Sequence, residues 1–287
     1  MQVQYKPFQF KITIAMQILS HTTPPLAHAP KIVFFDIDDT LYIKYDNYVP
    51  PSVTTALLAL KERGIMVAIA TGRGICVFPP AINELIDKVG IDLFVTINGQ
   101  YNEFRGEPLV DFALTSEQIR TTTDLLKRKN LAYGYMTRDA ILAFDETPAM
   151  TAALTSLHIP YRVVDSFDMT TPVYQMLTFY DDNSTIDLDL PSDLKTVRWH
   201  VSGVDILDAK GSKARGIQAV LDALGLDFSE AMAFGDGLND LEMLQAVGTG
   251  VAMGNAHPNL KAVADYVCPN HTDDGIYQGL KMLGVID

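Results

Sequence analysis

Unbroken apolar runs recur along the chain, and each is followed by a segment with helical spacing. The first run is KIVFF at 31–35, and residues 50–64 after it place apolar side chains three and four positions apart. Proline near the start of that segment and glycine at its end are typical boundaries of a helix. An apolar run without alternation predicts a strand that is covered on both faces, as in a parallel sheet.

The alternation of strand and helix continues to residue 99 and resumes after residue 208. Strands are predicted at 65–72, 92–99, 231–237 and 250–254, and helices at 79–90, 213–225, 239–248 and 258–266, with a closing strand and helix behind them. Alternation of this kind is typical of an α/β protein with a doubly wound parallel sheet. The sequence therefore predicts a Rossmann-like core.

Residues 102–207 interrupt this alternation. Adjacent strand-like runs, such as 132–137 and 140–145, alternate here with helices expected at 116–130 and 148–158. Hairpins beside helices indicate an α+β unit with an antiparallel sheet, inserted into the α/β domain. The expected division is an amino-terminal extension at 1–30, a catalytic core at 31–101 and 208–287, and an inserted α+β cap at 102–207.

The first thirty residues have no place in this pattern. A short apolar stretch at 10–20 follows Lys6, and Ala27-His28-Ala29 is similar to a signal-peptide cleavage site. Polar residues interrupt the stretch, however, and the first core strand starts only two residues after Ala29. We therefore expect an irregular extension or an early start codon rather than a secretion signal, and no run is long enough to span a membrane.

The charge of the chain narrows the range of partners. The net charge is −13, and no stripe of Lys and Arg is present, so nucleic acid and anionic membranes are not expected as partners. Cys76 and Cys268 have no metal-ligand spacing and are expected to remain reduced in a cytoplasmic protein. We expect a monomer or a weak homo-oligomer.

Charged and hydroxyl residues cluster where three of the predicted strands end. Residues 36–40 (DIDDT), 71–73 (TGR) and 235–240 (GDGLND) each follow an apolar run directly, and Lys213 opens a predicted helix. In a doubly wound sheet, ligands bind beyond the carboxyl ends of the strands, where the winding reverses. These side chains are therefore expected to face one crevice.

This set of residues suits phosphoryl transfer. Clustered carboxylates without soft ligands favour Mg²⁺, which would offset their mutual repulsion and the charge of a phosphate. Asp36, at the end of its strand, is placed to attack phosphorus, and Asp38 to protonate the leaving oxygen and then to deprotonate a water. The Thr71 hydroxyl, the Gly72 N–H and the Lys213 ammonium are candidates to hold the phosphoryl oxygens.

The four motifs, in this order, resemble those of the haloacid dehalogenase superfamily of aspartate-dependent phosphatases. The segments TINGQY at 96–101 and GVAMGNAHPNLKAVADYV at 250–267 are similar to its Cof-type branch, whose C2-type cap is inserted between the second and third motifs. The resemblance extends from about residue 30 to the end of the chain. It implies the same core fold with an inserted cap.

The resemblance also implies a role for each motif residue. Asp36 would be the nucleophile, and Asp38 would be the acid and base. Mg²⁺ would be bound by Asp36, the main-chain carbonyl of Asp38, Asp236 and, through water, Asp240. The phosphate would be bound by Thr71, Gly72, Lys213 and Asn239.

Other polar and aromatic residues have simpler interpretations. Arg73 is expected either to reach the substrate or to pair with a carboxylate. Trp199 is interpreted, with the tyrosines of residues 102–207, as packing within the cap. Three histidines are interpreted as structural or surface residues: His200, His257 and His271.

The predicted function is that of a Mg²⁺-dependent phosphatase, which hydrolyses small phosphorylated metabolites through an aspartyl-phosphate. Sugar phosphates are the leading substrate class that the resemblance implies, and phosphorylated cofactors such as flavin mononucleotide or pyridoxal phosphate come next. The alternatives are a phosphomutase with the same aspartyl-phosphate, a non-catalytic receiver domain, and an inactive protein that binds a phosphorylated metabolite. A receiver would need neither Asp38 nor the insert, and an inactive protein would not need every catalytic position.

Overall fold

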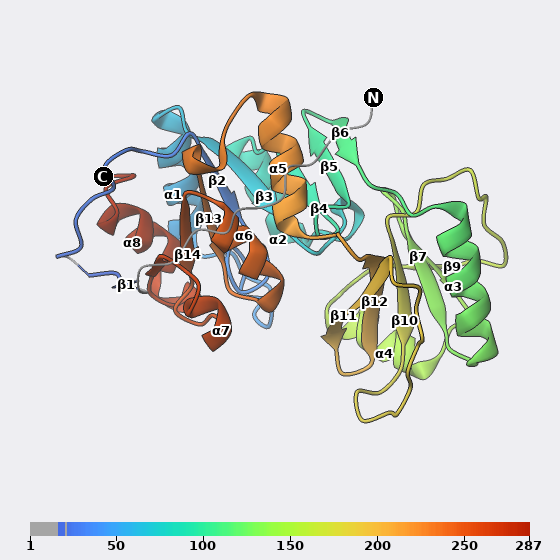
Figure 1. Ribbon diagram of the computed structural model, residues 1–287. Helices are drawn as coiled ribbons and strands as arrows, with labels where there is room; N and C mark the ends of the chain where they lie inside the picture. Colours follow the sequence, from blue (N-terminus) through green and yellow to red (C-terminus); the bar gives the residue numbers. More distant parts are fainter. Residues whose placement is uncertain (1–16, 21) are drawn as a thin grey trace.

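Two β-sheets organise the described part of the chain, and they lie in separate lobes (Figure 1). The computed structural model describes residues 17–20 and 22–287. The larger sheet has nine strands in the order β1-β15-β14-β13-β2-β3-β4-β5-β6. The smaller sheet has six strands in the order β11-β12-β10-β7-β8-β9.

Parallel strands form the centre of the larger sheet. They are β2 (Ile32–Phe35), β3 (Met66–Ala70), β4 (Leu93–Thr96), β13 (Ala231–Gly235), β14 (Thr249–Ala252) and β15 (Tyr266–Val267). All four residues of β2 are buried, because the strand pairs with β3 on one side and with β13 on the other, in the middle of the sheet. The predicted doubly wound parallel sheet is confirmed.

Helices pack on both faces of this sheet. They are α1 (Pro51–Glu62), α2 (Pro80–Val89), α5 (Lys213–Leu224), α6 (Leu241–Ala246), α7 (Pro258–Lys261) and α8 (Gly275–Met282). α1 packs against α2 and α8, whereas α5 packs against α6 and lies with it in front of the sheet in Figure 1. Short 3₁₀ turns occur at Ile75–Val77, Phe228–Glu230, Leu238–Asp240 and His271–Asp273.

Helix boundaries follow the local sequence where proline and glycine mark them. α2 begins at Pro80 and ends at Gly90, whose left-handed φ of 70° suits a residue without a Cβ. The helix predicted at 258–266 was too long. It ends at Lys261, because Tyr266 pairs with β14 as part of β15.

Residues 102–111, expected in the cap, lie in the larger sheet instead. β5 (Tyr101–Phe104) pairs antiparallel with β4, and β6 (Glu107–Asp111) pairs antiparallel with β5. The hairpin turns at Arg105-Gly106, where both residues have positive φ. A hairpin has the same local sequence pattern in either sheet, so the pattern did not reveal which sheet it joins.

The smaller sheet and two helices form the second lobe, called the cap below. Its strands are β7 (Tyr133–Met136), β8 (Ile141–Phe144), β9 (Arg162–Val163), β10 (Gln175–Phe179), β11 (Leu194–His200) and β12 (Gly203–Asp208). They pair antiparallel except for β8 and β9. Separate apolar clusters hold α3 (Ser116–Arg128) and α4 (Pro148–Ser156) to opposite faces of the sheet. Within residues 22–287 the chain crosses between the lobes twice, after β6 and before α5.

The amino-terminal extension is not wholly irregular. β1 (Gln17–Ile18) pairs in parallel with β15 and adds a strand to the edge of the larger sheet, and Leu19 after it is buried. The sequence did not predict this strand, because two residues carry no periodic signal. The signal-like stretch at 10–20 lies largely outside the described residues. Within residues 17–20 and 22–287, no helix has the length and hydropathy needed to cross a membrane.

Candidate active site

Four segments meet at the carboxyl ends of the central parallel strands. Asp36 follows β2, and its main-chain N–H still donates to Phe234 O of β13 at 3.1 Å. Thr71 follows β3, Asp236 follows β13, and Lys213 is the first residue of α5. The strand-end rule therefore placed these residues correctly in one crevice.

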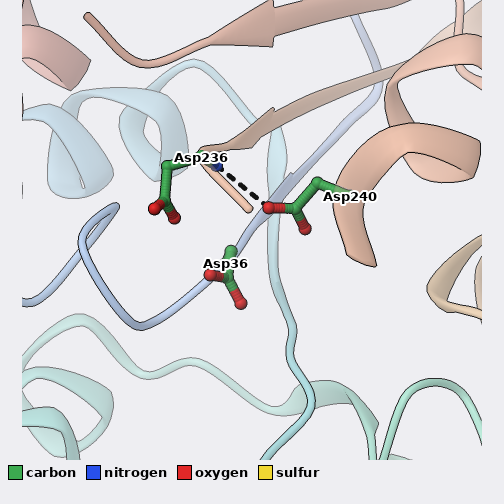
Figure 2. A group of neighbouring side chains, drawn as sticks. All are labelled: Asp36, Asp236 and Asp240. Atoms are coloured by element: carbon green, nitrogen blue, oxygen red, sulfur yellow. Dashed lines mark hydrogen bonds between the residues drawn. The ribbon is translucent and has the colours of Figure 1, made fainter. Parts of the chain in front are cut away.

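Three carboxylates converge in this crevice. Asp36, Asp236 and Asp240 each place one oxygen so that all three atoms lie within 4.8 Å of one another. Figure 2 shows the three side chains approaching from the end of β2, the end of β13 and the start of α6. Like charges at this separation repel, so the cluster needs a positive charge beside it.

Lys213 supplies one such charge beside the cluster. Its ammonium is completely buried and donates to Asp36 Oδ1 and to Asp240 Oδ1, both at 2.6 Å. Burial disfavours the ammonium, but the Asp240 and Asp36 carboxylates outweigh that effect and raise the pKa of Lys213. Lys213 is therefore charged, and it connects the first and last motifs of the site.

One cation does not neutralise three carboxylates. Burial, and after it the neighbouring carboxylates, raise the pKa of Asp36 to about 7 even though Lys213 opposes the change. Burial and the charges of Asp36 and Asp240 raise the pKa of Asp236 to about 8. The cluster thus has an excess of negative charge, which a further cation would offset.

Asp240 also fixes the loop that carries Asp236. Its Oδ2 accepts hydrogen bonds from the main-chain N–H groups of Asp236 and Gly237, both at 2.9 Å, and the first of these is the dashed line in Figure 2. A Cβ on Gly235 would lie 2.5 Å from the Asp240 carboxyl carbon, so only glycine fits there. The Thr40 hydroxyl donates to Asp236 Oδ1 at 3.1 Å and orients it.

Asp38 is held apart from the cluster by Arg73. The guanidinium donates from Nε to Asp38 Oδ2 at 2.7 Å and from Nη2 to Asp38 Oδ1 at 2.8 Å. This bidentate pair resolves the two expectations for Arg73 in favour of a carboxylate partner. It also means that the Asp38 side chain is not one of the three converging carboxylates.

Thr71, Gly72 and Asn239 line the same crevice. The Thr71 hydroxyl accepts the Arg73 main-chain N–H at 3.1 Å. A Cβ at Gly72 would stand 3.3 Å from Asn98 Oδ1, and Asn239 Nδ2 donates to that same Asn98 oxygen at 3.3 Å. Asn98 was not predicted as a site residue. It follows β4 as Asp36 follows β2, so the strand-end rule applied to this strand would have found it.

A cavity of about 380 Å³ joins this crevice to the cap. Its core side includes Asp36, Asp38, Thr71, Gly72, Asn98, Asp236 and Asn239. Its cap side includes Met136, Ile141, Gln175, Leu177, Trp199 and Asp205. Trp199, interpreted as internal to the cap, packs edge-on against Phe179 and also lines this cavity.

The protein-family model of the haloacid dehalogenase-like hydrolases matches residues 33–280. The chain belongs to this family. The family and the fold class predicted from the four motifs are confirmed, as is the expectation that the protein is an enzyme.

Individual relatives of this haloacid dehalogenase-like hydrolase cover most of its length. YkrA of Bacillus subtilis, a candidate phosphatase, is 34% identical over 89% of this chain and 98% of its own. A structure from Geobacillus kaustophilus is 37% identical, with a TM-score of 0.79, over 90% of this chain and all of its own. A solved sugar phosphatase of subclass IIB is 29% identical, with a TM-score of 0.80, over 89% of this chain and all of its own. These matches support the Cof-type branch.

The donor set of this hydrolase fits Mg²⁺. The three converging groups are carboxylates, with no thiolate or imidazole among them, and hard oxygen donors are those that Mg²⁺ prefers. The raised pKa values of Asp36 and Asp236 come from burial and crowding of negative charge. The Asp38 side chain is paired with Arg73 and lies outside this group, so the donor that Asp38 offers is its main-chain carbonyl.

Proposed function

We propose that this protein is a phosphatase that releases inorganic phosphate from small phosphorylated metabolites through an aspartyl-phosphate on Asp36. The observation that carries the proposal is the arrangement around Asp36. Lys213 binds its Oδ1, two further carboxylates flank it, and the cavity to the cap opens in front of it. A carboxylate held in this way is a fixed nucleophile beside a site for an anion.

In the first half of the proposed reaction, Asp36 attacks the substrate phosphorus. Lys213 occupies Oδ1, so Oδ2 is the attacking oxygen. The bond from phosphorus to the ester oxygen breaks, the electron pair leaves with that oxygen, and Asp38 gives it a proton. For this step Asp38 carries a proton on one oxygen, and Arg73 holds the carboxyl in the crevice through the other.

In the second half, water replaces Asp36 on phosphorus. Asp38, now ionised, takes a proton from the water, whose oxygen attacks phosphorus while the bond to Asp36 breaks. The products are inorganic phosphate and the free Asp36 carboxylate. One residue thus serves as acid and then as base, and the cap keeps other water out.

The remaining site residues would bind the phosphoryl group and the metal ion. The Thr71 hydroxyl, the Gly72 N–H, the Asn239 amide and the Lys213 ammonium would bind the phosphoryl oxygens. Asp36, Asp236, Asp240 and the Asp38 carbonyl would hold Mg²⁺, whose charge when bound offsets those of the carboxylates and the phosphate.

Relatives indicate the size of the substrate rather than its identity. The sugar phosphatase described above is 29% identical, and an HMP-PP phosphatase of Escherichia fergusonii is 26% identical over 81% of this chain and 87% of its own. Both names denote small phosphorylated molecules. A cavity of about 380 Å³ has room for molecules of that size.

The test is phosphate release from a panel of sugar phosphates, phosphorylated cofactors and p-nitrophenyl phosphate. We expect turnover with Mg²⁺, none in excess chelator, and recovery when Mg²⁺ is returned. Asp36→Asn should be inactive, whereas Asp46→Asn, at an exposed aspartate, should behave as the parent. Full activity in chelator would contradict the proposal. Isomerisation of a sugar phosphate without phosphate release would favour the phosphomutase.

A further inference from the structure

One face of the cap sheet forms the far wall of the cavity. Asp205 of β12 stands between Leu177 of β10 and Val197 of β11, which are its cross-strand partners. Side chains at paired positions point to the same face of a sheet, and all three line the cavity. Gln175 is two residues before Leu177 on β10, so it shares that face and also lines the cavity.

Asp205 is a buried carboxylate without a cation. It is only 7% exposed, and no Lys, Arg or His of the described residues lies within ion-pair distance of it. Burial raises the pKa of Asp205 to about 8, and Trp199 and Gln175 lower it only in part. A buried carboxylate of this kind is costly unless a proton or a ligand offsets its charge.

Two polar side chains beside Asp205 also have unused hydrogen-bonding capacity. Gln175 Oε1 is buried and has no hydrogen-bond partner within residues 17–20 and 22–287. Trp199 Nε1 is also buried and forms no well-aligned hydrogen bond there, although it is near enough to Asp205 to lower the pKa of that carboxyl. Trp199 reaches this position because Gly203 leaves room for its ring, since a Cβ there would lie 2.5 Å from the indole. Gln175 is 1% exposed, so water does not readily satisfy its oxygen.

The cations that line the cavity are already bound elsewhere. Arg73 is paired with Asp38, and Lys44 is paired with Asp39 at 2.7 Å. Nη1 of Arg198 donates to three main-chain carbonyls near the β11 end, those of Tyr180, His200 and Val201. None of these three cations is paired with Asp205.

Apart from Arg198, the rest of the cap wall is apolar. It is formed by Met136, Ile141, Leu157, Ile159, Leu177 and Val197. A molecule with hydroxyl groups on every side would leave most of them without partners against these side chains. A compact, largely apolar body with a donor at one end fits the wall better.

We propose that Asp205, Gln175 and Trp199 form a subsite for an amine or N–H group at the end of the substrate remote from its phosphate. This inference rests on the proposed phosphatase function and narrows its substrates to phosphate esters of amine-bearing or nitrogen-heterocyclic molecules. When such a group binds, Asp205 releases its proton to solvent, and the resulting carboxylate accepts from the N–H group and offsets its charge. Gln175 Oε1 accepts a second N–H. The Trp199 indole orients the carboxylate.

The test compares substrates that differ only in the amine. The pairs are glucosamine 6-phosphate with glucose 6-phosphate, and pyridoxamine 5′-phosphate with pyridoxal 5′-phosphate. For the parent, kcat/KM should favour the amine in a pair by about tenfold or more, the size expected for a hydrogen bond to a charged group. In Asp205→Asn that preference should fall towards one, while kcat for p-nitrophenyl phosphate changes less than about twofold.

A matched control and a binding measurement keep the test decisive. Asp165→Asn removes an exposed carboxylate of the cap and should keep the preference. The same comparison can be made without turnover by measuring Kd calorimetrically for both members of each pair. The two proteins compared are Asp36→Asn and the double variant Asp36→Asn, Asp205→Asn. If Asp205→Asn does not fold, Gln175→Met should lower the preference in the same direction.

Two results would contradict the proposed subsite. One is an unchanged preference in a folded Asp205→Asn or Gln175→Met enzyme. The other is an equal loss for all substrates, p-nitrophenyl phosphate included, which would indicate a purely structural role. Absence of phosphate release by the parent from p-nitrophenyl phosphate with Mg²⁺ would instead refute the proposed function itself.

Discussion

Asp36 and Asp38 are two residues apart, yet they contact different partners, Lys213 and Arg73. We expect Asp38→Ala to release one burst of nitrophenolate from p-nitrophenyl phosphate and then stall. Nitrophenolate leaves without a proton, whereas hydrolysis of the phosphoenzyme lacks its base. Rapid-quench kinetics measure the burst, which should equal about one product per enzyme. A burst from Asp36→Asn, or steady turnover by Asp38→Ala, would mean that the two roles are assigned wrongly.

Asp205 should make stability depend on pH. Burial raises its pKa from 3.8 to about 8, so between these values the folded protein binds a proton that the unfolded chain has lost. Relative to an ionised Asp205, this proton contributes fully to the free energy of unfolding below pH 3.8, the pKa in the unfolded chain. The contribution is lost as the pH rises towards 8. Asp205→Asn should therefore gain in melting temperature relative to the parent between pH 5 and pH 8, on the order of a few degrees. A gap that shrinks over this range would contradict the expectation, and Asp165→Asn should show no trend.

At the scale of elements, the turn between β7 and β8 is fastened to β5 of the core. Arg138 donates to Tyr101 Oη and to Glu103 Oε2, both at 2.8 Å, and Tyr101 also donates to Glu103. Within residues 22–287 only two segments connect the cap to the core, so the cap can move relative to the core. A contact of Arg138 with β5 therefore favours the closed position of the cap. We expect Arg138→Ala to raise KM for metabolite substrates roughly fivefold, as loss of about 1 kcal/mol implies.

The same substitution should leave kcat for p-nitrophenyl phosphate nearly unchanged, because Arg138 does not line the cavity. Steady-state kinetics on both substrates separate the two effects. Arg120→Ala is the control, since Arg120 pairs with Glu117 inside α3 and away from the core. Equal KM values for the Arg138 and Arg120 variants would show that the contact of Arg138 with β5 does not help to close the cap.

At the scale of the whole molecule, the cap and the core are expected to separate between β6 and α3, not at residue 102. Replacing residues 113–208 by a short linker keeps β5 and β6 in the core sheet. This variant should fold and retain slow p-nitrophenyl phosphate turnover. Removing 102–207 deletes both strands, uncovers β4 and should give a protein that melts far lower. Circular dichroism and kinetics of the two deletions decide the boundary, and equal stability would contradict it.

The sequence by its pattern predicted the core strands and the proximity of the residues at their ends. Apolar runs identify the parallel strands, and parallel strands place their carboxyl ends at one edge. Asp36, Thr71 and Asp236 could therefore be brought together from the sequence. Lys213 was harder, because a lysine at the start of a helix is ordinarily solvated. Its burial between Asp36 and Asp240 confirms the proximity that the motif order indicated.

The contacts between distant segments became known from the packing of the folded chain. The sequence left Arg73 with two possible partners, and it gave no sign that β1 joins β15 or that β5 and β6 join the core sheet. Nor did it single out Asp205, since an aspartate in an apolar strand acquires its environment from three strands and the opposite lobe. Periodicity records which face of an element is buried. What covers that face, and therefore what a buried carboxylate can bind, depends on packing between residues far apart in the chain.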